Sequence, residues 1–209
     1  MITMDEYLID DLIDLHFSVL KEIFKGSSFF DIQRHYSDEM RKLDYMNLAK
    51  NNNLLTFDDD NNLIGAYPVS PLKTSFKVSV EGIGECYCMC AIDALGIAYT
   101  FGKKTTIESK DSSTGQKIVI TVDPETDSVQ TAGTEYFVSY RDPDKVRNIA
   151  LDQCPVINFY SDKNSVKDDT LVIFTFQEAI KHAKDIFSPE AFKKSFLEGF
   201  KAIPKENLI

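Results

Sequence analysis

The sequence predicts an α+β protein in which helices come first, β-strands fill the middle and helices return at the end. Apolar side chains between residues 8 and 23 recur at every third or fourth position, as on one face of an amphipathic helix. From about residue 74 to residue 174, short alternating segments separated by turn-forming residues are instead typical of β-strands. We therefore expect residues 1–70 to form a helical domain and residues 71–209 to form a mixed β-sheet domain with C-terminal helices.

The N-terminal part is expected to contain three helices, from about Asp5 to Lys25, from Phe29 to Tyr36 and from Asp38 to about Lys50. The apolar segments Leu54–Phe57 and Leu63–Tyr67 follow on either side of an Asp- and Asn-rich turn, and they predict a β-hairpin. Helices followed by a hairpin of this kind look like a winged helix. The first domain is therefore predicted to be winged-helix-like.

The segment from Pro68 to Pro71 is the expected linker between the two domains. Apolar segments then predict the strands Thr74–Val80, Gly84–Met89, Thr105–Ser109, Gln116–Val122, Tyr136–Tyr140, Val156–Tyr160 and Leu171–Phe174. Thr175-Phe176-Gln177-Glu178 has the pattern of a capping box and begins a helix that is expected to end near Phe187. Ser188-Pro189 is expected to begin the last helix, because proline is favoured at the first helical position.

Composition restricts the class of partner. The chain has 209 residues, 43% of them hydrophobic, and a formal net charge of −10, which argues against nucleic acid or an anionic membrane as partner. The predicted hairpin turn contains Asp58-Asp59-Asp60, where a DNA-binding wing would carry Lys or Arg. No apolar run approaches the ~20 residues that span a bilayer, and the first residues do not look like a signal peptide. We therefore expect a cytoplasmic protein whose four cysteines are thiols.

Three of the four cysteines lie in one stretch, Glu85–Leu95. The residues before Cys90 alternate like a strand and Ala91–Leu95 is rich in helix formers, so Cys90 is expected where a strand leads into a helix. Residues three apart share a helix face, which would bring Asp93 close to the Cys90 sulfur. The free N–H groups of a helix start are also expected to lower the pKa of this thiol and favour the thiolate near neutral pH.

Cys90, Asp93 and the distant fourth cysteine, Cys154, form a candidate metal-binding set. Two thiols and a carboxylate would suit a soft, thiophilic metal better than zinc, which usually takes four N or S ligands in spaced pairs. The alternative is that Cys90 is a buried and inert thiol, as free cysteine often is.

Three segments resemble blocks of the organomercurial (alkylmercury) lyase family. Tyr87–Leu95 resembles the family signature, an aromatic-rich run that ends in Cys-Ala-Leu-Asp-Thr-Leu. Ile107–Ile118 is similar to the family's Glu-Ser…Thr-Gly hairpin, and Cys154–Ser161 is similar to its second cysteine block. The blocks occur in the family's order, and the similar region extends roughly from Gly65 to Ser161.

The resemblance implies an enzyme of mercury resistance and detoxification. Such an enzyme cleaves carbon–mercury bonds by protonolysis and yields a hydrocarbon and Hg(II). Carried over residue by residue, the site consists of Cys90 and Cys154, whose sulfurs bind mercury, and Asp93, which delivers the proton and can also ligate the product ion. No resident cofactor is implied, since mercury is bound as substrate and product and a thiol reductant assists product release. The implied partners are a small organomercurial and a mercury-accepting thiol protein or small thiol. The resemblance also implies a winged-helix-like N-terminal domain that packs as a lid or brace.

The sequence departs from the family pattern at several positions. Met89 stands where the family has a bulky aromatic residue before the first cysteine, and Pro155-Val156 follow the second cysteine in place of polar residues. Asp111 stands where some members of the family have an extra, non-catalytic cysteine in the hairpin.

Cys86 and Cys88 are additions to the family pattern, and in a strand they share one face with position 90. They leave two interpretations open. Either they are idle buried thiols, or they hand on or compete for mercury. A second function class is then a non-enzymatic protein that binds a soft metal such as Hg(II) or Cu(I).

The remaining candidate side chains carry weaker signals. His16, His35 and His182 lie in expected helices, far along the sequence from the cysteine blocks and without metal-ligand spacing, so we interpret them as surface or core residues. Tyr87, Phe159 and Tyr160 are expected to line the pocket or to pack beneath it. No Gly-rich phosphate loop follows a strand, so no nucleotide cofactor is expected.

Overall fold

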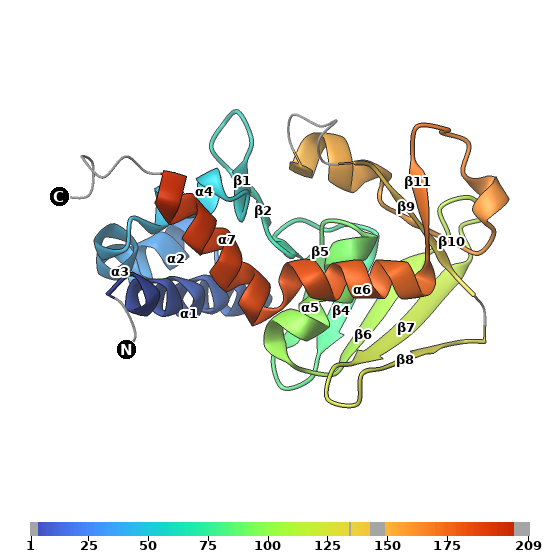
Figure 1. Ribbon diagram of the computed structural model, residues 1–209, viewed down its shortest axis with the longest axis horizontal. Helices are drawn as coiled ribbons and strands as arrows, with labels where there is room; N and C mark the ends of the chain where they lie inside the picture. Colours follow the sequence, from blue (N-terminus) through green and yellow to red (C-terminus); the bar gives the residue numbers. More distant parts are fainter. Residues whose placement is uncertain (1–3, 134, 143–148, 203–209) are drawn as a thin grey trace.

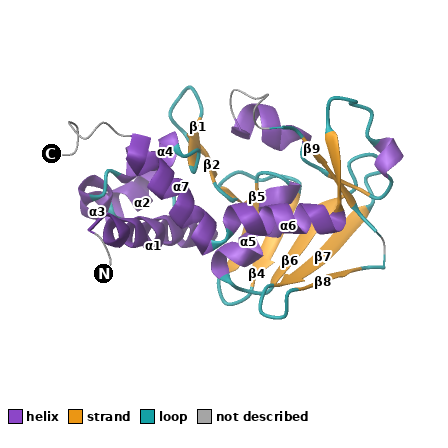
Figure 2. Ribbon diagram, in the orientation of Figure 1, coloured by secondary structure: helices purple, strands orange, loops and turns teal. Residues whose placement is uncertain are grey.

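The computed structural model describes residues 4–133, 135–142 and 149–202, which form helices and two antiparallel sheets of eight and three strands (Figures 1 and 2). Helix α5 (Ala91–Phe101) packs both on the larger sheet and on helix α6 (Phe176–Phe187). The predicted α+β class is confirmed. A mixed sheet was expected, but every strand pairing among the described residues is antiparallel.

The N-terminal helices are α1 (Met4–Phe24), α2 (Phe29–His35), α3 (Ser37–Lys42) and α4 (Tyr45–Asn51). The apolar stripe of α1 is buried as its spacing predicted, with Leu12 and Val19 fully inaccessible. The single helix expected from Asp38 to about Lys50 is divided into α3 and α4. Asp44 has a left-handed backbone (φ +48°), which an α-helix of L-residues does not accommodate, so that prediction is wrong.

The larger sheet has the strand order β1-β2-β3-β5-β4-β6-β7-β8. Its strands are β1 (Leu55–Phe57), β2 (Leu63–Ala66), β3 (Val69–Ser70), β4 (Phe76–Val80), β5 (Gly84–Cys88), β6 (Thr105–Lys110), β7 (Lys117–Asp123) and β8 (Ser128–Thr131). Strand β3 lies in the segment expected to be a linker, where Val69 pairs with Ala66 of β2 and with Cys88 of β5. The linker prediction is wrong for these residues. The N-terminal hairpin β1–β2 therefore continues the sheet that contains the cysteine-rich strand.

The smaller sheet has the order β10-β9-β11, with β10 (Phe159–Tyr160), β9 (Phe137–Tyr140) and β11 (Val172–Thr175). A strand was expected over Val156–Tyr160, but only its last two residues form one. A π-helical turn, Ile149–Gln153, and a 3₁₀ turn, Cys154–Val156, precede it. Pro155 has no N–H to donate to a sheet, which favours this turn over a longer strand.

The two C-terminal helices pack against helices from earlier in the chain. Thr175 Oγ1 accepts the backbone N–H of Glu178 at 3.3 Å and Glu178 accepts that of Thr175 at 2.8 Å, so the predicted capping box is confirmed. Helix α7 (Pro189–Ala202) contacts α1, α4 and α6, and Figure 1 shows it crossing the N-terminal helices. None of the described helices is long and apolar enough to cross a membrane.

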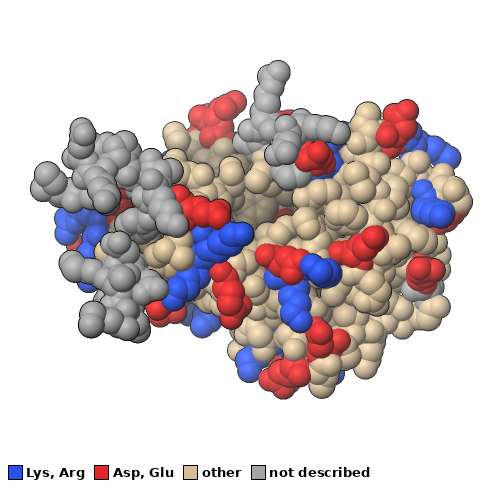
Figure 3. Space-filling view, viewed as in Figure 1, with Lys and Arg blue, Asp and Glu red and all other residues tan. Residues whose placement is uncertain are grey.

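Acidic and basic side chains are interspersed over α6 and α7 on the face shown in Figure 3. Several of the lysines there form ion pairs with acids: Lys181 with Asp185, Lys184 with Asp127, and Lys193 with Asp10. Pairing of this kind leaves the face without the dense positive charge that phosphate backbones require.

Asp111, directly after β6, anchors the turn between β6 and β7. Its buried carboxylate accepts the N–H groups of Ser113 and Thr114, and the N–H and hydroxyl of Ser161, over 2.6–2.8 Å. Burial raises the pKa of this carboxyl, but these hydrogen bonds outweigh burial and hold the pKa of Asp111 below its ordinary range. The aspartate found at this departure from the family pattern thus ties the β6–β7 turn to the residue that follows β10.

Candidate active site

Cys90 caps the start of α5. The backbone of Cys90 is extended, and its sulfur accepts the backbone N–H of Asp93 at 3.5 Å. This N–H is one of those that have no acceptor within the first turn of a helix. The predicted strand-to-helix transition at Cys90 and the proximity of Asp93 are both confirmed.

Cys154 approaches the start of α5 from the turn that follows β9. The hydroxyl of Ser139 on β9 donates to the carbonyl of Val156 at 2.6 Å. The first N–H of α5 donates to the carbonyl of Ile157 at 3.2 Å, which joins the turn directly to the helix. As a result the Cys154 sulfur lies 3.9 Å from Asp93 Oδ2.

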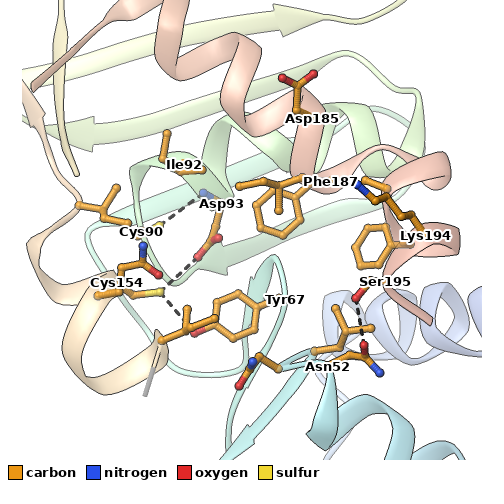
Figure 4. A pocket seen from close by; sticks show the side chains of 18 of the residues that line it. Asn52, Tyr67, Cys90, Ile92, Asp93, Cys154, Asp185, Phe187, Lys194 and Ser195 are labelled. Atoms are coloured by element: carbon orange, nitrogen blue, oxygen red, sulfur yellow. Dashed lines mark hydrogen bonds between the residues drawn. The ribbon is translucent and has the colours of Figure 1, made fainter. Parts of the chain in front are cut away.

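Cys90, Asp93 and Cys154 form one buried cluster (Figure 4). The two sulfurs and one carboxylate oxygen lie within 4.8 Å of one another, and each residue is at most 4% exposed. In the part of the chain that the structure describes, no other His, Cys, Asp or Glu side chains gather in threes so closely. The residues that the resemblance selects are thus brought together from two distant segments, in an arrangement able to hold one soft metal ion.

Burial sets the protonation of this cluster. Burial raises the pKa of the Cys90 thiol well above its usual range, and the neighbouring Cys154 and Asp93 add to the effect. The hydrogen bond from the Asp93 N–H acts in the opposite direction. The expected lowering of the Cys90 pKa is therefore wrong, because desolvation of a buried thiolate outweighs one long hydrogen bond. Burial also raises the pKa of Asp93 to about 7, in spite of hydrogen bonds with both cysteines.

Tyr67, to which sequence analysis gave no role, belongs to the same cluster. Its hydroxyl lies 3.3 Å from the Cys154 sulfur. Burial, followed by the charges of Cys154 and Asp93, raises the pKa of Tyr67 far above its usual range, so it stays a neutral phenol. An ionised Asp93 only accepts hydrogen bonds, so the Cys154 S–H donates to Asp93 and the Tyr67 O–H donates to the sulfur.

A cavity of about 360 Å³ opens from the cluster. Apolar and aromatic side chains make up much of its wall: Ile92, Tyr140, Ile149, Ile157, Phe187 and Phe192. Figure 4 shows the cluster at one end and Asn52, Lys194 and Ser195 at the other. The cavity therefore joins the buried thiols to a polar region where the N-terminal part meets α7. The α6–α7 residues of this wall follow the cysteine blocks in sequence, and no local pattern marked them.

The two additional cysteines lie outside this cavity wall. Cys86 and Cys88 are both buried, and the Cys86 sulfur contacts the Ser70 carbonyl at 3.7 Å. Burial raises the pKa of Cys86 to about 11 and the pKa of Cys88 well above its usual range. Both side chains are therefore protonated and poorly accessible near neutral pH.

None of the three aromatic residues expected in or beneath the pocket lines the cavity. Phe159 is fully buried against Phe76, while Tyr87 and Tyr160 are half-buried elsewhere. The expectation that these side chains line the pocket is therefore wrong.

The histidines are surface or core residues, as expected. His35 is exposed, His182 is half-buried, and His16 is fully buried. His16 is nevertheless close to the site in space, because its Nε2 contacts the Tyr67 carbonyl at 3.0 Å.

Known proteins resemble this chain over the same region. A sequence model of the family described as alkylmercury lyase (MerB) matches residues 69–188, which is more than half of the chain. Curated proteins named alkylmercury lyase from Bacillus cereus and from Clostridium butyricum are each 30% identical to it over 97 residues. The matched region is 46% of this chain and 44% of each relative, so the chain spans less than half the length of the relatives it matches.

A crystal structure of the mercury-bound form of MerB2 has a similar fold, with a TM-score of 0.65 over 92% of this chain and 98% of that one. The two sequences are 15% identical, so this similarity concerns the fold alone. The family match includes both cysteine blocks and the hairpin between them, and it confirms the resemblance found in the sequence. The chain belongs to the alkylmercury lyase family.

Proposed function

We propose that this chain is an organomercurial lyase, which cleaves carbon–mercury bonds by protonolysis and releases a hydrocarbon and Hg(II). The observation that carries the proposal is the buried cluster in which the Cys90 and Cys154 sulfurs and an Asp93 oxygen lie within 4.8 Å. Mercury is a soft ion that prefers thiolate ligands. Cleavage also needs a group that delivers a proton to the carbon. The cluster contains two thiols that can bind mercury and a carboxyl group that can deliver the proton.

The organomercurial cation first moves from its leaving thiolate to one cysteine of the cluster, and the proton of that cysteine goes to the leaving thiolate. The second cysteine then binds the mercury and gives its proton to the Asp93 carboxylate. The Cys154 sulfur is 3.9 Å from Asp93 Oδ2, which suits it to this second role. Because the pKa of Asp93 is about 7, the carboxyl can both accept and donate a proton near neutral pH.

The carbon–mercury bond breaks in the last chemical step. Two thiolates on the metal raise the electron density on the attached carbon. The electron pair of the carbon–mercury bond takes up the proton from Asp93 and becomes a carbon–hydrogen bond. Hg(II) stays on Cys90 and Cys154, with Asp93 available as a further ligand. Two protonated thiols, either small thiols or those of an acceptor protein, then remove the metal by exchange and return both cysteines to the protonated state.

The cavity supports a small organic group on the substrate. Its volume of about 360 Å³ and its aromatic and aliphatic walls offer an apolar environment beside the cluster. Such walls exclude water from the proton that Asp93 carries. The reaction as proposed needs no resident cofactor, because mercury enters as part of the substrate. Four free thiols suit a reducing compartment, so a cytoplasmic location is part of the proposal.

We further propose that residues 1–70 are a winged-helix-like domain that braces the catalytic residues 71–209. Supporting this, Leu54 and Tyr67 of the N-terminal part contribute to the cavity wall. Helix α7, which contributes to the cavity wall, also packs on α1 and α4.

The experiment that tests the function is to incubate the purified, reduced protein with methylmercury and excess small thiol and to measure evolved methane. Methane release by the wild type and its loss in Cys90→Ser would support the lyase function. A folded wild type that binds Hg(II) but evolves no methane would instead favour the alternative, non-enzymatic binding of a soft metal.

A further inference from the structure

We propose that Tyr67 is a positioning residue, which turns the Cys154 thiol toward Asp93, and that His16 holds Tyr67 in place for this task. The inference rests on the proposed lyase function, because it assumes that Cys154 passes its proton to Asp93. Neither Tyr67 nor His16 lies in the family's cysteine blocks.

The Cys154 sulfur lies between a hydrogen-bond donor and an acceptor. The Tyr67 hydroxyl is 3.3 Å away and Asp93 Oδ2 is 3.9 Å away (Figure 4). A cysteine side chain has three staggered χ1 positions, and these two contacts together favour the one that is occupied. When Asp93 is ionised, the single S–H of Cys154 donates to the carboxylate and the Tyr67 O–H donates to the sulfur. Tyr67 therefore directs the thiol proton toward the residue that has to receive it.

Tyr67 is itself held from the N-terminal helices. Its backbone carbonyl lies 3.0 Å from Nε2 of the fully buried His16, and His16 Nδ1 lies 2.8 Å from the Tyr45 hydroxyl. A carbonyl only accepts, so Nε2 carries the proton and Nδ1 accepts the O–H of Tyr45. Helices α1 and α4 thereby fix the backbone of the residue that touches Cys154.

Gly65 of β2 lies near both Met89 and Tyr67. A Cβ on Gly65 would be 3.4 Å from the Met89 sulfur and 3.6 Å from the edge of the Tyr67 ring, which is ordinary van der Waals contact.

Tyr67→Phe tests the proposal, because it keeps the ring and removes the hydroxyl. We expect kcat for methane release from methylmercury to fall about 10- to 100-fold, the usual cost of a hydrogen bond to a reacting group. KM, the number of Hg(II) ions bound and the thermal midpoint should stay close to those of the wild type, since both thiols and the packing remain. Tyr136→Phe, the same change at a buried tyrosine outside the cavity wall, is the matched control and should leave kcat unchanged.

The possible results separate this inference from the function on which it rests. A wild type that evolves no methane refutes the lyase function. With an active wild type, an unchanged kcat in Tyr67→Phe overturns the positioning role, even if the thermal midpoint falls, because the hydroxyl is then only structural. A raised KM with an unchanged kcat also overturns it, because the hydroxyl then acts in substrate binding.

Discussion

The Cys90 sulfur accepts the backbone N–H of Asp93 at 3.5 Å, so the first residues of one helix fix a thiol and a carboxyl against each other. Cys154 completes the cluster from another part of the chain. Burial raises the pKa of Cys90 and keeps it protonated, and it brings the pKa of Asp93 to about 7. Near neutral pH the cluster thus combines a protonated Cys90 thiol with a carboxyl that can both take up and give up a proton.

Asp93→Asn is expected to stabilise the folded protein, and to do so more at about pH 8 than at about pH 5. Burial raises the pKa of Asp93 from 3.8 to about 7, so the folded state keeps a proton that the unfolded state releases between these values. The stability of the wild type therefore falls as the pH rises from about 4 to about 7, by at most about 4 kcal/mol. The Asp93→Asn variant has no carboxyl group to ionise at this position, so its stability does not fall with pH for this reason. Urea unfolding at the two pH values measures the difference, and an equal effect at both would contradict the raised pKa.

Gly96→Ala is expected to destabilise the fold. A Cβ at this position of α5 would lie 2.2 Å from the Phe187 ring at the end of α6. Alanine is the better helix former by about 1 kcal/mol, but overpacking costs about 1–3 kcal/mol. The clash therefore outweighs the gain in helix propensity, and the free energy of unfolding falls. Denaturant unfolding measures the effect. In a Phe187→Ala background the same change should cost less, and an identical cost in both backgrounds would rule out the clash as the cause.

Cys86→Ala/Cys88→Ala is expected to retain both methane release and the number of Hg(II) ions bound. Both thiols are buried, protonated and outside the cavity wall. Titration of the reduced variant with Hg(II), alongside turnover, provides the measurement, and Cys90→Ala/Cys154→Ala is the matched control that should lose mercury. A folded Cys86→Ala/Cys88→Ala protein that no longer holds Hg(II) would support metal storage instead.

Local patterns predicted the parts of the site that local structure controls. Cys90 and Asp93 are three residues apart at a helix start, and helix geometry alone brings them together. Cys154 is 61 residues from Asp93, so no local pattern brings the two together. Its residue type made it a candidate ligand of the same metal, and the resemblance to a family assigned it a role in the site. Tyr67 had neither kind of signal, because its contact with Cys154 depends on how β2 and β3 join the sheet.

The errors of the sequence analysis also have physical causes. Val69 and Ser70 lie between prolines and were interpreted as a linker, but pairing with β5 makes them a strand. The Cys90 pKa was expected to fall because a helix start attracts negative charge. Burial, which depends on the whole fold, has the larger effect and raises it. Tertiary context overrides the local rule in both cases.

The central claim is that Asp93 delivers the proton that breaks the carbon–mercury bond. Its most direct test is methane evolved from methylmercury, with excess small thiol, by the wild type, Asp93→Asn and Asp93→Ala. Binding of Hg(II) needs only the two sulfurs, so both variants should retain it, whereas loss of a general acid should lower methane release by at least about 100-fold. Methane release undiminished in Asp93→Asn, which has no usable acidic proton, would contradict the claim.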